Sequence, residues 1–283
     1  MSDEREDLLR SARQLIETDV LLGGDLIPAV RNPLPAPQAP AGAPAVENRD
    51  SPHLLRKEKG ASPSAAPPRW GSIPPLDLES LPQTPADKAA ALEALREICL
   101  KCCCCGLGKT RTNLVFGEGS PAAELVFVGE APGEDEDLSG RPFVGRAGQK
   151  LTEMIVAMGL TREDVYICNM LRCRPPHNRT PAPEEVQACW PYLIRQLQIV
   201  RPKAIVTLGN PATQNLLQTT TGITRLRGQW QKLPDHAPGL GGIAVMPTFH
   251  PSYLIRSYTP ENRRNVWNDL QKVMELLGLP PKK

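Results

Sequence analysis

The sequence lacks a long hydrophobic run. Nowhere in its 283 residues do about 18 apolar residues stand in a row, the length that a membrane-spanning helix needs. It also lacks an export signal, because the N-terminal MSDEREDLLR is acidic and shows no basic stretch followed by an apolar one. These absences exclude a membrane span and a secretory signal, and we expect a cytoplasmic protein that does not contact a membrane.

The first third of the chain lacks the composition of a folded core. Residues 33–85 hold 13 of the 31 prolines, and such a stretch buries too little apolar surface to form a core. We expect a disordered, flexible linker over residues 31–86, preceded in residues 1–30 by an amphipathic helix that could dock on a replication or repair protein. The apolar side chains at helical spacing in that helix are Leu8, Leu9, Ala12, Leu15 and Ile16.

The net charge of +2 is unevenly distributed along the chain. Residues 1–90 carry 10 Lys and Arg against 13 Asp and Glu, and residues 91–283 carry 23 against 18. The two parts therefore have net charges of −3 and +5. A positive balance on the part that can fold is compatible with a polyanionic partner, although many proteins without such a partner carry as much.

Strand and helix patterns alternate from residue 87 onward. Short apolar runs typical of buried strands cover residues 124–129, 165–171, 204–209 and 242–249. Helical spacing covers residues 87–99, 148–159, 184–200, 211–218 and 260–278, the third of these despite Pro191. This alternation predicts one domain over residues 87–283, a three-layer α/β/α architecture around a central, mostly parallel four-stranded sheet. Ligands of such sheets bind beyond the carboxyl ends of the strands.

Two of the segments beyond strand ends carry residues suited to ligand binding. Residues 129–137 hold two glycines and five acids, which suit hydrogen bonding to ligand N–H groups but are also typical of a solvated acidic turn. Phe143 follows in a loop rich in Gly and Pro, where it either contacts a ligand or folds back as a plug. The residues alone leave both alternatives open.

The segment after the last strand combines a histidine, two bulky side chains and a cation. A lone histidine such as His250 is more often structural than catalytic, but here it is expected at the same sheet edge as the acidic segment. Tyr253, Leu254 and Arg256 follow it on one loop. This combination suits wedging into a DNA duplex while holding phosphate.

Eight cysteines in a chain without an export signal indicate metal ligands or redox groups rather than disulfides. Cys102 and Cys105 have the C-x2-C spacing of metal ligands, and Cys173 and Cys189 lie 16 residues apart farther along. Four thiolates suit zinc or an iron-sulfur cluster, and spacing does not separate the two. Because Cys99 and Cys102 also have C-x2-C spacing, spacing alone leaves the choice of ligands open.

From about Cys99 to the C-terminus the chain resembles the family 4 uracil-DNA glycosylases, the iron-sulfur class of the uracil-DNA glycosylase superfamily. The resemblance rests on five segments in order: RTNLVFGEG (111–119), GEAPGEDED (129–137), GRPFVGRAG (140–148), CNMLRCRPPHNRTP (168–181) and FHPSYLIR (249–256). It covers the last two thirds of the chain and implies nothing about residues 1–86.

The resemblance implies a 4Fe-4S cluster and selects its ligands. The family's second ligand lies shortly before the RTN segment, which gives the set Cys102, Cys105, Cys173 and Cys189. The cysteines left over are Cys99, Cys103, Cys104 and Cys168. The run of four consecutive cysteines departs from the family pattern, so a swapped ligand stays an alternative.

The resemblance also implies a uracil-binding site. Its residues are Glu130, Ala131, Glu136, Phe143, Asn169 and His250. Phe143 is implied to stack on the base, Asn169 to read its polar edge, and His250 to donate to its O2. Asn offers a donor and an acceptor together, as the O4 and N3–H of uracil require, whereas cytosine presents the opposite polarity.

Further roles follow from the same resemblance. Glu136 is implied to lie near C5 of the pyrimidine, where it would crowd the methyl group of thymine. Ala131 stands where the family 1 enzymes carry an Asp, so Glu130 is the leading candidate for activating water and, with His250, the catalytic pair. Leu254 or Tyr253 would fill the gap that the flipped nucleotide leaves, and Arg256 belongs to the same DNA contact.

The implied activity is that of a monofunctional uracil-DNA glycosylase acting in base excision repair in the prokaryotic cytosol and nucleoid. It would flip uracil out of single- or double-stranded DNA as a monomer, hydrolyse the N-glycosidic bond, release uracil and leave an abasic site. The core motifs contain no lysine to act as an amine nucleophile, which predicts no strand cleavage. The alternatives are a glycosylase for several deaminated bases and a non-catalytic DNA-binding protein stapled by a metal.

Overall fold

The computed structural model describes residues 81–280, and the helix expected in residues 1–30 lies outside this part. Most of the expected linker, residues 31–80, lies outside it too. The first described helix, α2 (Pro85–Leu100), begins two residues earlier than the sequence pattern predicts. The side chain of Thr84 caps it by accepting from the backbone N–H of Asp87 at 3.1 Å.

A six-stranded sheet forms the centre of the described part. In the order β1-β3-β2-β4-β6-β5, its strands are β1 (Glu118–Gly119), β3 (Tyr166–Asn169), β2 (Leu125–Gly129), β4 (Ala204–Leu208), β6 (Ala244–Thr248) and β5 (Gln231–Lys232). The four inner strands are parallel and the two edge strands pair antiparallel. The four predicted strands and their parallel pairing are confirmed, but the sheet has six strands rather than four. Each of the two added edge strands is too short, at two residues, to show a pattern in the sequence.

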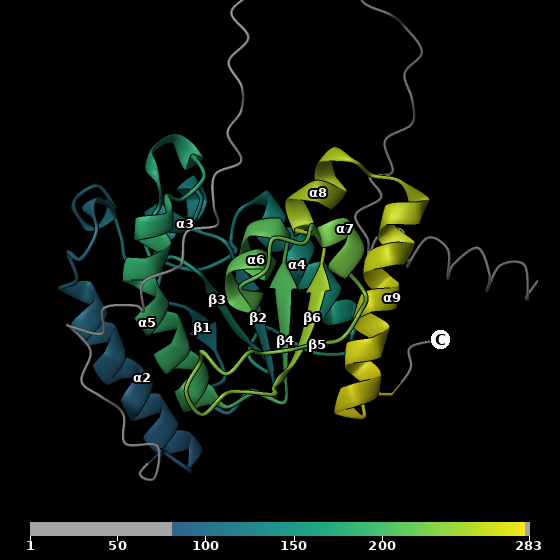
Figure 1. The fold of residues 1–283 in the computed structure, drawn as a ribbon, viewed down its shortest axis with the longest axis horizontal. Coiled ribbons are helices and arrows are strands. Elements are labelled where there is room, and N and C mark those ends of the chain that lie inside the picture. The colour runs from purple at the N-terminus through teal and green to yellow at the C-terminus, as the bar shows by residue number, and fades with distance from the viewer. Residues whose placement is uncertain (1–80, 281–283) are drawn as a thin grey trace, which may run out of the picture. The chain divides into compact units, whose positions relative to one another are not determined.

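Helices cover both faces of the sheet and confirm the predicted α/β layers (Figure 1). The helices after α2 are α3 (Glu134–Ser139), α4 (Arg146–Ala157), α5 (Pro183–Val200), α6 (Asn210–Leu217), α7 (Ile223–Leu226), α8 (Pro251–Arg256) and α9 (Pro260–Leu277), with short 3-10 turns at Gly106–Lys109 and Pro176–Asn178. Val126 and Val128 of β2 pack on the side of α5 and α6, and Leu125 and Phe127 pack on the side of α4 and α9. Alternate residues of one strand thus serve two cores.

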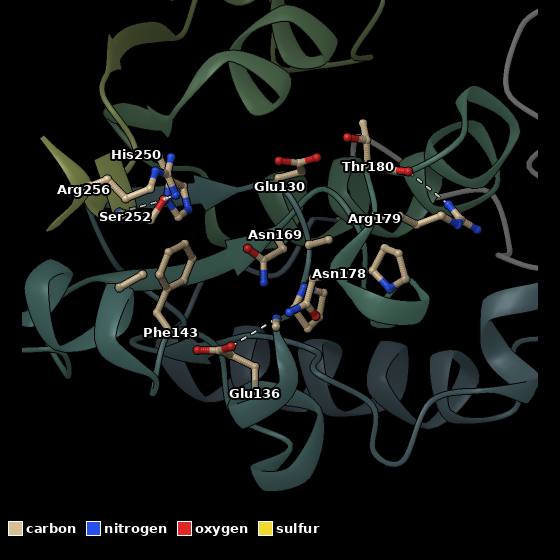
Figure 2. A pocket seen from close by; sticks show the side chains of 15 residues that line it. Glu130, Glu136, Phe143, Asn169, Asn178, Arg179, Thr180, His250, Ser252 and Arg256 are labelled. Atoms are coloured by element: carbon tan, nitrogen blue, oxygen red, sulfur yellow. Dashed lines mark hydrogen bonds between the residues drawn. The ribbon is translucent and has the colours of Figure 1, made fainter. Parts of the chain in front are cut away.

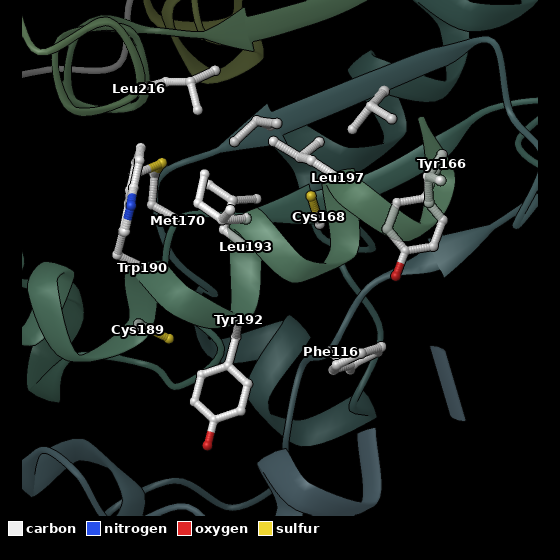
Figure 3. Close-up of a cluster of buried hydrophobic side chains, with 14 of the residues drawn as sticks. Phe116, Tyr166, Cys168, Met170, Cys189, Trp190, Tyr192, Leu193, Leu197 and Leu216 are labelled. Carbon is white, nitrogen blue, oxygen red and sulfur yellow. The ribbon is translucent and has the colours of Figure 1, made fainter. Parts of the chain in front are cut away.

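Helix α5 continues through Pro191, as the sequence pattern predicts. Proline in a helix removes a backbone hydrogen bond, which tertiary packing must outweigh. From Cys189 to Val200 the helix is buried on all sides, between the sheet and α2. Figure 3 shows Leu193 and Leu197 pointing toward Cys168 of β3, while Tyr192 points away from the sheet.

Two segments expected as loops are helices instead. The acidic residues 134–137 begin α3, where four acids in the first turn complement the positive N-terminal end of the helix dipole. The segment after His250 is α8. Within residues 81–280, none of the helices is both long and apolar enough to cross a bilayer.

Candidate functional site

A cavity of about 430 Å³ opens beyond the carboxyl ends of β2, β3 and β6, the place that the sheet topology predicts. It brings together seven of the residues predicted for base or DNA binding: Glu130, Ala131, Glu136, Phe143, Asn169, His250 and Arg256. Figure 2 shows the Phe143 ring, the Asn169 amide and the His250 ring around the same space. Residues separated by up to 126 positions in the sequence therefore form one pocket.

Phe143 forms one wall of the cavity. Its backbone is in the left-handed region, with φ of 53°, and its ring lies 5.8 Å from the His250 ring, centroid to centroid. A Cβ at Gly148 would overlap the Phe143 backbone, so glycine is needed there for α4 to pack against the loop. The ring is 6% exposed, because it packs on the core as well as lining the cavity.

Glu136 holds the loop that carries Phe143. One carboxylate oxygen accepts from the backbone N–H groups of Val144 and Gly145, each at 2.9 Å, and the other accepts from Gly133 at 3.1 Å. Three hydrogen bonds fix the carboxylate on the cavity wall. Glu136 therefore organises the site as well as lining it.

Asn169 is the last residue of β3 and pairs with Gly129 at the end of β2. Its side chain is 2% exposed, and its Oδ1 has no hydrogen-bond partner among the described residues. A Cβ at Gly129 would overlap this oxygen and the Phe143 ring, so glycine makes the room for both. A buried acceptor without a partner costs about 1–3 kcal/mol, which a ligand donor in the cavity can recover.

His250 caps the N-terminus of α8 and is held in one tautomer. Its Nδ1 accepts from the backbone N–H of Ser252 at 3.1 Å and lies 2.8 Å from the Ser252 hydroxyl. Burial, together with the positive charge of Arg256, lowers the pKa of His250 to about 4. At neutral pH the ring is therefore uncharged, and because Nδ1 accepts, the proton sits on Nε2.

Glu130 follows the last residue of β2 and lines the cavity beside Ala131. Burial raises the pKa of its carboxyl, which strengthens it as a proton acceptor once ionised. Ala131 brings no ionisable group. Glu130 is thus the carboxylate that the segment after β2 contributes to this part of the wall.

The structure corrects the role expected for Leu254. This side chain is 4% exposed and lies in the core beside Val266 and Leu270 of α9, so it is not presented to a duplex. Because α8 is a helix, its inner face turns Leu254 inward and leaves Arg256 exposed. Tyr253 is half-buried, with its ring 4.7 Å from that of Phe249, and it does not line the cavity.

The cavity also has residues that the sequence analysis did not single out. They include Ser252 and, on the opposite wall, Pro175, Asn178, Arg179 and Thr180. Arg179 is paired with Glu185, at 2.6 and 2.8 Å. The signal for this wall was present in the segment CRPPHNRTP, and the signal for Ser252 was its place two residues after His250.

Five thiols gather where α2, the segment after β3 and α5 meet. We call Cys99, Cys102, Cys105, Cys173 and Cys189 the cysteine cluster, because they belong to one packed group of side chains. Burial raises the pKa of Cys189 to about 12 and also raises that of Cys173. Of the other three cysteines, Cys103 and Cys104 are exposed and Cys168 is buried in the core.

Two guanidinium groups face the cysteine cluster. Arg111 donates to the Sγ of Cys173 at 3.3 Å, and the positive charge of Arg172 acts on Cys99 and Cys189. Within residues 81–280, no three His, Cys, Asp or Glu side chains lie close enough together to hold a single metal ion. The donors are nevertheless all sulfur, and cations beside them favour thiolates.

Comparison with known proteins places the chain among DNA glycosylases. The model of the uracil DNA glycosylase superfamily matches residues 116–271. The type-4 uracil-DNA glycosylase of Thermotoga maritima is 48% identical over 187 residues, 66% of this chain and 94% of that protein. That of Archaeoglobus fulgidus is 49% identical over 191 residues, 66% of this chain and 92% of that protein. A type-5 uracil-DNA glycosylase of Pyrobaculum aerophilum is 33% identical over 151 residues, 48% of this chain and 64% of that protein.

Proposed function

The chain belongs to the type-4 uracil-DNA glycosylases of the uracil DNA glycosylase superfamily, and we propose that the cavity beside Asn169 binds a uracil flipped out of DNA. The protein is an enzyme that hydrolyses the N-glycosidic bond of uracil in DNA. Free uracil and an abasic site are the products, as in base excision repair.

The unpartnered Oδ1 of Asn169 is the observation that carries this proposal. Uracil presents a donor, N3–H, beside an acceptor, O4, and one amide can meet both. Cytosine has an acceptor and a donor at these positions, so the same amide repels it. The fixed position of Asn169 at the end of β3 thus supports selection of uracil.

Stacking on Phe143 supports the flipped state. Extruding a base from the stack costs a few kcal/mol, and stacking on an aromatic ring returns about 1–3 kcal/mol. The three hydrogen bonds of Glu136 hold the Phe143 loop before DNA arrives. We also assign to Glu136 the exclusion of a methyl group at C5, and hence of thymine.

Bond cleavage leaves negative charge on the uracil and positive charge on the sugar. The neutral His250 ring donates through Nε2 to O2 of the leaving base, while Ser252 holds the other nitrogen. A neutral donor suits this role, because it stabilises the anion without giving up its proton. Glu130, ionised, accepts the proton of the attacking water.

We assign a 4Fe-4S cluster to Cys102, Cys105, Cys173 and Cys189. An all-sulfur donor set suits such a cluster, and four irons keep their thiolate ligands farther apart than a single ion does. When bound, the cluster supplies a cross-link between the end of α2, the segment after β3 and α5. Cys173 lies only four residues after Asn169, so this cross-link supports the base-reading strand end.

Matched oligonucleotides containing U, T or hypoxanthine, in single- and double-stranded form, test the activity. The purified, iron-containing chain should produce alkali-labile sites only at U. Equal cleavage at U and hypoxanthine would replace this proposal with a broader specificity. No cleavage at U, with equal binding of U-containing and normal DNA, would make the protein a non-catalytic binder. About four iron per chain supports the cluster, and zinc without colour contradicts it.

A further inference from the structure

Arg172 lies inside the protein between the base-reading residue and the cysteine cluster. It follows Asn169 by three positions, directly precedes Cys173, and is 0% exposed. Its guanidinium donates through Nη1 to the backbone carbonyls of Asn169 and of Met170, the latter at 3.1 Å. Its Nη2 donates to the side chain of Gln196 on α5.

These bonds clamp the turn that follows β3. On the other side of the turn, the N–H of Met170 donates to Gly129 at 2.8 Å and that of Leu171 to Glu130 at 3.0 Å. The turn is therefore held between the end of β2 and the Arg172 guanidinium. Because the carbonyl of Asn169 is one of the two acceptors, the guanidinium fixes the backbone from which the uracil-reading amide projects.

The charge of Arg172 has no carboxylate partner in residues 81–280, where none of the ion pairs includes it. A buried cation is expensive without an opposite charge. The titratable groups on which its positive charge acts are the thiols of Cys99, Cys168 and Cys189 and the hydroxyl of Tyr166, and its own backbone N–H donates to Cys189. A thiolate-bound iron-sulfur cluster carries net negative charge. It would supply the opposite charge that the buried guanidinium of Arg172 lacks.

We propose that Arg172 is a positioning residue that links the cysteine-bound cluster to the uracil-reading amide of Asn169. This inference rests on the proposed function of the cavity and of the cysteine cluster. The negative charge of the cluster holds the guanidinium in place, and the guanidinium in turn holds the carbonyl of Asn169. The cluster then contributes to base recognition through one side chain, without touching the DNA.

Two substitutions separate the charge of Arg172 from its shape. Arg172→Met removes both the charge and the hydrogen bonds, and Arg172→Lys keeps the charge but replaces the planar fork by one ammonium. Arg195→Met is the matched control, because it removes another buried guanidinium from the protein, on α5. Thermal midpoints show which variants are folded.

The first readout is the affinity for two DNA probes. One is an oligonucleotide with 2′-fluoro-2′-deoxyuridine, whose glycosidic bond resists cleavage, and the other carries a tetrahydrofuran abasic-site analogue. We expect Arg172→Met and Arg172→Lys to lose at least tenfold in affinity for the uracil probe, and less than twofold for the abasic probe. Arg195→Met should bind both probes like the unmodified chain.

The second readout is the reduction potential of the iron-sulfur cluster in the purified holoprotein. Removing a nearby positive charge disfavours electron uptake, so Arg172→Met should have a more negative potential. Arg172→Lys and Arg195→Met should match the unmodified chain. If Arg172→Lys keeps the reduction potential but loses affinity for the uracil probe, the charge of Arg172 and its hydrogen bonds to the turn after β3 have separate effects. A general loss of stability would not produce this combination.

Failure of the inference is distinguishable from failure of the proposed function. If the unmodified chain releases uracil and folded Arg172→Met matches it in both readouts, the inference is wrong and the activity stands. Equal losses of affinity for the uracil and abasic probes would also overturn it, because they indicate a general defect in DNA binding. If the unmodified chain contains no iron, both the assignment of the iron-sulfur cluster and the proposed role of Arg172 are wrong.

Discussion

The cavity and the cysteine cluster lie at the two ends of one short segment, from Asn169 to Cys173, and they are built in opposite ways. In the cavity the protein itself orients the polar groups, as backbone N–H groups do for Glu136 and Ser252 does for His250. In the cysteine cluster, burial raises the pKa values of Cys173 and Cys189, so thiolates there depend on nearby cations and on a bound group.

Because of this difference, we expect substitutions in the cavity to affect mainly the reaction and substitutions in the cysteine cluster to affect mainly the stability of the fold. The cavity is organised before any ligand arrives, and its unpartnered Oδ1 is available for binding. Substitutions there should therefore slow the reaction and leave the fold intact. The cysteine cluster connects three segments, so substitutions there should reduce stability first and activity as a consequence.

The largest expected effect is from Cys189→Ala. Loss of a ligand should release the iron and lower the free energy of unfolding by several kcal/mol, because metal binding is coupled to folding. Cys168→Ala is the matched control, since Cys168 is also buried but is a core residue of β3 outside the cysteine cluster, and it should cost about 1 kcal/mol. Iron content and denaturant unfolding measure both. A Cys189→Ala protein that keeps its iron would point to Cys99 as the replacing ligand.

Asn169→Ala should reverse this pattern, with a large loss of activity and a small loss of stability. Removing the amide should slow uracil release by about 10³-fold, the scale of losing a preorganised polar group in an active site. Its Oδ1 has no partner in the described structure, so no bond to that atom is lost. Single-turnover rates and thermal midpoints test this, with Asn215→Ala on α6 as the control that should change neither.

Leu254→Ala tests whether the segment after His250 belongs to the core or to the DNA contact. A buried leucine truncated to alanine should lower the free energy of unfolding by about 2–5 kcal/mol. Affinity for abasic DNA, measured at a temperature where the variant is folded, should stay within about twofold, because Leu254 faces α9. Unchanged stability with a large loss of DNA affinity would restore the role that the sequence suggested.

The smallest effect is the pH dependence of kcat/KM for uracil release. A base must be ionised, so kcat/KM should fall about tenfold per pH unit below the pKa of Glu130, which burial places above its usual value. Glu130→Gln should remove this limb and leave only a decline near pH 4, where His250 becomes protonated. A limb that persists unchanged in Glu130→Gln would assign the base to another group.

Much of the site could be predicted from the sequence because its parts lie at strand ends. Glu130 and His250 come after strands that short apolar runs identify, and Asn169 ends another such strand. Parallel strands bring such ends together, and the loop with Phe143 follows the first of them. The wall formed by Asn178, Arg179 and Thr180 was not predicted, because its segment has no regular pattern. Ser252 was missed because its role is local, fixing one ring nitrogen of a neighbour.

Helices α3 and α8 show why the rest could not be predicted. Both α3 and α8 have six residues, too few for helical periodicity to stand out. Whether Leu254 faces DNA or the core depends on the helical turn of α8 and on the neighbouring α9. The residues around Leu254 in the sequence indicate neither the helical turn of α8 nor the packing of α9 against it.

The sequence by itself determined the parallel sheet, the place of the site and the family resemblance, since each rests on periodicity or on motifs in a fixed order. Only the tertiary structure decided how the side chains are used. It turned Leu254 inward, gave His250 a low pKa, left the Oδ1 of Asn169 without a partner, and buried Arg172 with its hydrogen bonds to the turn after β3. These properties depend on burial and on neighbours distant in the chain, which no local pattern encodes.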